Sequence, residues 1–166
     1  MPVTAEDARR IMQDIADHPA SHKLAVENVV KQYRRLGKWM KVNAEHLGAH
    51  LGVSAAYTMG VVGRVLELTG HRLGPVSDPE IEAAGAQVME AVPGLLPLDG
   101  GLAGRLAAVP WAAEPGILQV LVEDVFAEHP DEEGRQPPEV LFQVFVLVWV
   151  AVEVLSVAAT PTPSGR

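Results

Sequence analysis

Cysteine is absent from the 166-residue chain. Without thiols the protein can form no disulfide, no thiolate nucleophile and no cysteine-based zinc or iron–sulfur site. The sequence also lacks a nucleophile elbow, a P-loop and a dinucleotide-binding glycine motif. The glycines of LDGGLAGR, residues 98–105, follow no expected strand and include no phosphate-binding lysine, so they indicate a turn into a short helix. We therefore expect neither catalysis nor a bound cofactor.

A secretory signal is also missing from the N-terminal stretch. The first residues, MPVTAEDARR, do not show the basic and then apolar pattern of such a signal. Export is therefore not indicated, and we expect the protein to be cytoplasmic.

Charge is unevenly divided along the chain. The formal net charge is −8, yet residues 1–76 carry ten Lys/Arg against seven Asp/Glu, whereas residues 77–166 carry three against fourteen. The basic half could face phosphate or an acidic partner, and the acidic half would be repelled by nucleic acid. Because 48% of the residues are hydrophobic, we expect one core, and both halves to belong to one compact domain.

Helical periodicity predicts an all-α bundle of about seven helices. Thr4 with Glu6 and Asp7 gives a capped helix start, and Asp78-Pro79-Glu80 gives another with proline at the first position. Glycine and proline separate the elements near residues 18–19, 74–75 and 92–94. The expected helices cover 4–18, 21–40, 44–51, 54–69, 78–92, 114–126 and 140–159, with at most a short one around 102–109.

The most apolar run, Val140–Ala159, is compatible with more than one structure. Its alternating valines suit a strand, but an unbroken strand of this length would be unusual, so we expect a helix. A helix of this length can also cross a bilayer. Gln143 and Glu153 would each need a partner in lipid, and no Lys/Arg cluster flanks the run. We expect a central helix of the bundle, with Glu139, Gln143 and Glu153 on a stripe at a surface or interface.

The stretch AEHLGAHLGVSAAYTMGVVGRVLELTG, residues 44–70, resembles the helix-turn-helix family. Leu47-Gly48, Leu51-Gly52-Val53-Ser54 and Val61-Val62 match the family pattern in order and spacing. The resemblance implies a short helix, a turn at Gly52-Val53 in which Gly52 takes a left-handed conformation, and a second helix from Ser54 that could enter the major groove of DNA. Thr58 departs from the pattern, because an apolar anchor is expected there unless the register shifts to Met59.

The second helix lacks the side chains that discriminate bases. Paired hydrogen bonds to base edges come from Arg, Lys, Asn or Gln, and none of these occurs in its first two turns. Small residues instead make a smooth strip against which another helix can lie closely. We therefore predict a protein-interaction surface made of Ala56, Met59, Gly60 and Gly63.

Other candidate residues are cations and histidines. Basic residues opposite the apolar stripe of helix 21–40, and just beyond it, could contact phosphates, or they could form a solvated face. They are Lys31, Arg34, Arg35, Lys38 and Lys41. His46 and His50 have the spacing at which one helix holds a metal ion with two imidazoles, but no motif supplies a third ligand. The simpler interpretation is two histidines on a partly exposed helix face.

Three functional hypotheses follow. The preferred one is a non-enzymatic helical module that assembles with itself, as a homo-oligomer, or with another protein. The second is a DNA-binding regulator whose acidic half dimerises or senses a ligand. The third is a soluble domain tethered to a membrane by residues 140–159.

Overall fold

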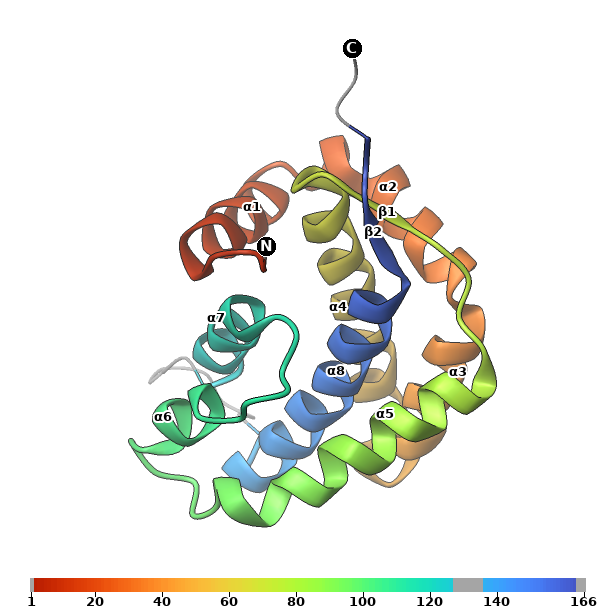
Figure 1. The fold of residues 1–166 in the computed structure, drawn as a ribbon. Helices are drawn as coiled ribbons and strands as arrows, with labels where there is room; N and C mark the ends of the chain where they lie inside the picture. The colour runs from red at the N-terminus through yellow and green to blue at the C-terminus, as the bar shows by residue number, and fades with distance from the viewer. Residues whose placement is uncertain (1, 127–135, 164–166) are drawn as a thin grey trace.

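The computed structural model describes residues 2–126 and 136–163 (Figure 1). Over these residues the chain forms eight α-helices, two short 3-10 helices and one antiparallel pair of strands, which confirms the all-α prediction. The α-helices are α1 (Ala5–Asp17), α2 (Pro19–Gln32), α3 (Arg34–Asn43), α4 (Ala49–Leu68), α5 (Asp78–Ala91), α6 (Leu102–Ala107), α7 (Pro115–Val125) and α8 (Pro138–Ala158). The 3-10 helices are η1 (Glu45–Leu47) and η2 (Val92–Leu95), and the strands are β1 (His71–Leu73) and β2 (Ala159–Pro161).

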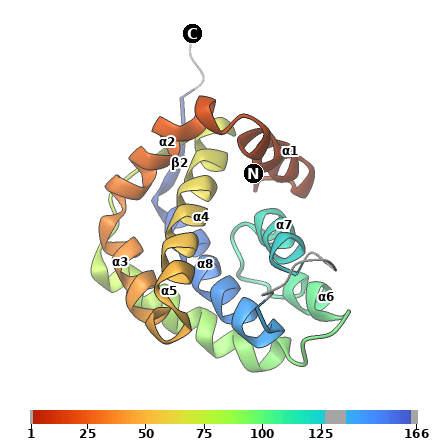
Figure 2. The same ribbon diagram turned by 180° about the vertical axis from the view of Figure 1, so that it is seen from behind.

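Helix α8 occupies the centre of the fold, as expected for the apolar run. It packs against α4, α5 and α7, and the side chains of Phe145, Trp149 and Leu155 are completely buried. Figures 1 and 2 show α4 and α8 side by side, with α2 and α3 on one flank and α6 and α7 on the other. Both α4 and α8 are long and apolar enough to span a bilayer, a property that core helices share, and 72% of the most apolar window of α8 is buried.

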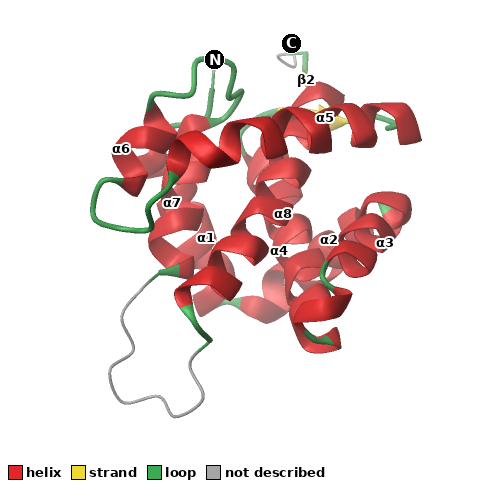
Figure 3. Ribbon diagram, turned by 90° about the horizontal axis from the view of Figure 1, so that it is seen from below, coloured by secondary structure: helices red, strands yellow, loops and turns green. Residues whose placement is uncertain are grey.

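The two halves of the chain contribute to the same hydrophobic cluster. Helix α1 packs on α7, and α4 packs on α8, so each contact joins the basic half to the acidic half. The backbone N–H of Val3 also donates to the buried carboxylate of Glu114 over 2.7 Å. Strand β2 returns to β1, with His71 opposite Pro161 and Leu73 opposite Ala159. Figure 3 shows how α1, α6 and α7 gather on one side of α8 and α2 and α3 on the other.

The prediction of a single helix over residues 21–40 is wrong, because the chain forms two helices that are divided at Tyr33. Tyr33 leaves the helical region, with φ −105° and ψ 42°, and α3 begins at the next residue. The Tyr33 hydroxyl donates to the carbonyl oxygen of Gly74 over 2.6 Å, and Gln32 donates to that of Leu73 over 3.0 Å. These bonds to the connection between β1 and α5 accompany the change in chain direction.

The turn predicted at Gly52-Val53 is also wrong. Helix α4 runs without interruption from Ala49 to Leu68, and the chain turns at Gly48, which has a φ of 115°. The predicted helix 44–51 is reduced to η1. Gly52 instead permits close packing, because a β-carbon there would lie 3.2 Å from the α-carbon of Lys41. The left-handed position expected at Gly52 therefore falls at Gly48.

Candidate functional site

The strip of small residues on α4 is covered by the protein itself. Ala56, Met59, Gly60 and Gly63 are all buried. A β-carbon on Gly60 would lie 2.8 Å from Cγ2 of Val30, and one on Gly63 would collide with Val29, both on α2. The prediction that this strip receives a closely packed helix is therefore right, but the helix is α2 of the same chain. These residues do not form a free interaction surface.

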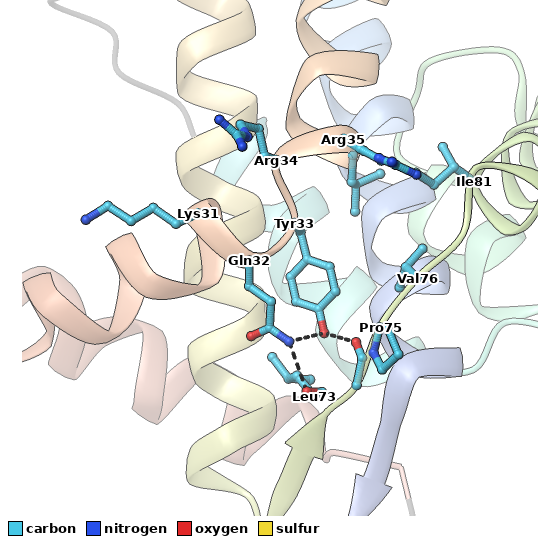
Figure 4. A pocket seen from close by; sticks show the side chains of 11 residues that line it. Lys31, Gln32, Tyr33, Arg34, Arg35, Leu73, Pro75, Val76 and Ile81 are labelled. Carbon is cyan, nitrogen blue, oxygen red and sulfur yellow. Dashed lines mark hydrogen bonds between the residues drawn. The ribbon is translucent and has the colours of Figure 1, made fainter.

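The five predicted phosphate-contacting cations are exposed and come from two helices. Lys31 lies on α2, whereas Arg34, Arg35, Lys38 and Lys41 lie on α3. Figure 4 shows Lys31, Arg34 and Arg35 pointing in different directions around a pocket of about 450 Å³. Arg35 also lies 3.7 Å from the carboxylate of Asp78. Arg34, Lys38 and Lys41 share one face of α3, because they are spaced by four and three residues.

The floor of this basic pocket is already hydrogen-bonded. Figure 4 shows the Tyr33 hydroxyl and the Gln32 amide directed at the carbonyls of Gly74 and Leu73. Burial, followed by the nearby Glu67 carboxylate, raises the pKa of Tyr33 to about 12, so the phenol keeps its proton at neutral pH. The hydrogen bonds at the floor of this pocket therefore stabilise the junction between α2 and α3.

His46 and His50 do not share a helix, which contradicts the prediction of an i, i+4 pair on one face. His46 lies in η1 and His50 in the first turn of α4, on opposite sides of the turn at Gly48. Within residues 2–126 and 136–163, no group of three metal-ligating side chains is clustered. His46 instead donates from Nε2 to Oε1 of Gln143 on α8 over 2.8 Å.

That hydrogen bond lies at the edge of an apolar groove of about 410 Å³, which we call the α5–α8 groove. Its apolar lining consists of Met89, Val92, Leu96, Leu98, Phe142, Val146 and Leu147, and its polar edge consists of Asn43, His46, Glu139 and Gln143. Ligand sites in proteins are typically concave, largely apolar and bordered by a few polar groups. Among the cavities of the described residues, this groove matches that description best.

Residues 95–99 form the wall of the groove opposite α8, and Arg105 holds this segment in place. Its Nε donates to the carbonyl of Leu95 over 2.8 Å, and its terminal nitrogen donates to Pro97 and to the Asp99 carboxylate. Hydrogen bonding from Arg105 lowers the pKa of Asp99, so that carboxylate is charged at neutral pH. These bonds fix residues 95–99, which carry Leu96 and Leu98 into the groove.

The fold leaves large apolar side chains uncovered at this site. Met89 at the end of α5 is 58% exposed, and Leu96 is 48% exposed. Trp39 of α3 packs against Gly85 of α5, where a β-carbon would lie 3.1 Å from the indole ring, and this close approach holds α5 near α3. Exposed apolar side chains beside a preformed groove are a feature of binding surfaces.

Glu153 does not lie on the surface stripe predicted for α8. It is 7% exposed, accepts a hydrogen bond from Nε1 of Trp149 over 3.1 Å, and is approached by the backbone N–H of Ala113 at 3.4 Å. Burial raises the pKa of Glu153, against the effect of these hydrogen bonds, and the carboxylate of Glu114 raises it further. Gln143, on the other hand, is exposed beside the groove, as the stripe predicted.

No protein-family model, curated protein or solved structure matches this chain. The α5–α8 groove is therefore the feature of the molecule that bears most directly on its function. Sequence reasoning missed most of its lining because the residues come from three separate parts of the chain, near 43–46, 89–98 and 139–147. A local signal was present in the consecutive apolar residues Leu95 and Leu96, which precede a polar turn.

Proposed function

We propose that this chain is a non-enzymatic protein-interaction module that holds apolar side chains of a partner helix in the α5–α8 groove. The observation that carries the proposal is the exposure of Met89 and Leu96 on the walls of a groove with a predominantly apolar lining. Burying such side chains on association is favourable, at about 25 cal/mol per Å² of apolar surface.

The dimensions of the groove support a helical partner. It follows α8 from Glu139 to Leu147, which corresponds to about 12 Å of helix. A partner helix of similar length presents two or three apolar anchors at spacings of three and four residues. The bonds from Arg105 hold one wall before binding, which reduces the entropy lost on association.

The position of α4 favours a protein partner over DNA. The exposed face of α4 includes Val53, Ser54 and Tyr57, and the first two turns of the helix contain no Arg, Lys, Asn or Gln. A recognition helix reads base edges in the major groove with such side chains. The α5–α8 groove, in contrast, is largely apolar, which suits a protein partner.

Selection of helical peptides from a display library tests the proposal. We expect selected peptides to bind wild-type protein at least about tenfold more tightly than Leu96→Glu, because the new carboxylate would be buried without a partner. Leu24→Glu is the matched control, since Leu24 is 68% exposed on α2, away from the groove. Equal binding to the wild type and Leu96→Glu would overturn the proposal.

Light scattering identifies whether the partner is a second copy. If it is, the mass of the wild type rises with concentration, and Met89→Glu and Leu96→Glu remain monomeric. If the wild type stays monomeric at all concentrations, the partner of the groove is a different protein.

A further inference from the structure

We infer that Arg64 changes its partner with pH: it donates to His22 while the imidazole is neutral, and it moves to Glu67 when the imidazole gains a proton. We call Asp14, His22, Arg64 and Glu67 the His22 switch. None of these residues lines the α5–α8 groove, so the switch is independent of the proposed function.

His22 is a buried imidazole that joins three helices. It lies on α2 and is 6% exposed. Its Nε2 lies 2.7 Å from Oδ2 of Asp14 on α1, and its Nδ1 lies 3.3 Å from Nε of Arg64 on α4. Both ring nitrogens are therefore engaged, each by a different helix.

The two partners determine where the imidazole carries its proton. A guanidinium has donors only, so Nδ1 accepts the bond from Arg64 and carries no proton. The proton of the neutral ring is then on Nε2, which donates to the carboxylate of Asp14. Hydrogen bonding from His22 lowers the pKa of Asp14, so this carboxylate is charged at neutral pH. The imidazole is thus a neutral link between an anion and a cation.

A second proton on the ring is compatible with only one of the two bonds. Histidine side chains ordinarily change charge between about pH 5 and 8. A proton on Nδ1 removes the acceptor that Arg64 uses and brings two positive groups into contact. The bond to Asp14 is retained and becomes charge-assisted on both sides. Protonation therefore displaces Arg64 and keeps Asp14.

Glu67 is the carboxylate that can receive the displaced guanidinium. It lies three residues after Arg64 on α4, a spacing at which side chains on one helix meet. Partial burial raises the pKa of Glu67 and the charge of Arg64 lowers it, so the two groups are already within electrostatic reach. Among the described residues Glu67 has no ion-pair partner. A short side-chain movement therefore gives Arg64 a new partner.

The remaining titratable groups beside the switch belong to α1, α2 and the junction between them. His18, at the junction, lies 3.1 Å from the other carboxylate oxygen of Asp14. Asp17 accepts a hydrogen bond from within α1, and Lys23 is exposed on α2. Among the hydrogen bonds of the described residues, none joins these three side chains to Arg64.

Helix α2 does not need to move when Arg64 changes partner. Val26 and Val29 of α2 pack directly on Gly60 and Gly63 of α4. This apolar contact is the same in both protonation states. The switch therefore relocates one guanidinium and leaves the helices in place.

Heteronuclear NMR of the full wild-type chain tests the switch. At about pH 8 the His22 ring should carry its proton on Nε2. On acidification the Nε–H signal of Arg64 and the carboxyl carbon signal of Glu67 should both shift with the same midpoint as the His22 ring. Arg9, whose guanidinium is bound to Glu123, is the internal control and should not follow that midpoint.

Three results would overturn the switch. They are a proton on Nδ1 of His22 at about pH 8, an Arg64 signal that does not follow the His22 ring, and a Glu67 signal that stays constant while Arg64 shifts. Each is read from the wild type, so the test does not depend on a variant that folds.

Two glutamine variants locate the effect. His22→Gln keeps a neutral side chain with a donor and an acceptor, so the step in the Arg64 and Glu67 signals should disappear between about pH 5 and 8. His18→Gln is the matched control, because His18 contacts the same carboxylate and is exposed, and it should retain the step. A step that survives in folded His22→Gln, or is lost in folded His18→Gln, would assign the effect to another group. Circular dichroism verifies the fold of each variant.

Discussion

Trp149 donates its indole N–H to the carboxylate of Glu153 one turn further along α8, inside the core. Trp111 stacks on Trp149 with ring centroids 5.5 Å apart and an angle of 7° between the planes, and Ala113 approaches Glu153 from the same loop. The central helix therefore holds the connection between α6 and α7 through one polar group and one aromatic pair. A substitution that removes the negative charge of Glu153 and keeps a hydrogen-bond acceptor would measure how much the buried charge alone lowers the stability of the protein.

Glu153→Gln should make stability less dependent on pH. Because the pKa of Glu153 is raised in the folded state, its stabilising contribution is complete below the ordinary value of about 4.3 and is lost as pH rises through the folded value. Glutamine keeps an acceptor for Trp149 and cannot ionise. Between about pH 4 and 8, urea unfolding should show the wild type losing on the order of 1 kcal/mol more than the variant. Parallel pH profiles would contradict this account.

Gly63→Ala should destabilise the protein by about 1–3 kcal/mol, because the new methyl group overlaps Val29 and forces α2 away from α4. The matched control is Gly104→Ala in α6, where a β-carbon would have nothing within 4 Å. There alanine should be neutral or stabilising by up to about 1 kcal/mol, since it favours helix. Thermal unfolding measures both variants. In a Val29→Ala background, where the side chain that meets the new methyl group is smaller, Gly63→Ala should lower the free energy of unfolding by less than it does in the wild type.

Tyr33→Phe should cost about 1 kcal/mol in the free energy of unfolding, because the carbonyl of Gly74 loses its hydrogen bond from the phenol. A Tyr57→Phe background leaves Tyr33 as the only tyrosine, so its ionisation can be followed by ultraviolet absorbance. The midpoint should lie near pH 12, because burial raises its pKa. A midpoint near 10, the value of a solvated phenol, would show that this junction is open in solution.

Arg105→Met should loosen the wall of the α5–α8 groove without unfolding the helices. The substitution removes the donors to Leu95, Pro97 and Asp99, so amide hydrogen exchange should accelerate in residues 95–101. Arg10→Met is the control, since the one bond that Arg10 forms to the described residues is exposed and joins it to Asp7 on the same helix. Unchanged exchange at residues 95–101 would mean that the wall is stable without Arg105.

The sequence predicts elements best where local rules act alone. Residues 140–158 had to be helical because a strand of that length is rare, and the structure agrees. The break at Tyr33 could not be foreseen, because neither Tyr33 nor Arg34 disfavours helix and the accepting carbonyl is 41 residues away. Gly48 and Gly52 both suit a left-handed turn, and only the close approach of Lys41 distinguishes them.

The candidate site was less predictable than the fold. The α4 strip was correctly identified as a helix-packing surface, but its occupant, α2, depends on tertiary structure. The α5–α8 groove exists only when residues 43–46, 89–98 and 139–147 are assembled, and each segment contributes a few residues that look unremarkable in sequence.

The central position of α8 also determines the order in which the protein can be completed on the ribosome. All the helices that pack against α8 precede it in the chain, so they are synthesised first. A nascent chain ending before Pro138 therefore exposes to solvent the apolar faces of α4 and α5 that α8 will cover. Until translation passes this point, those faces are available to chaperones or to other nascent chains.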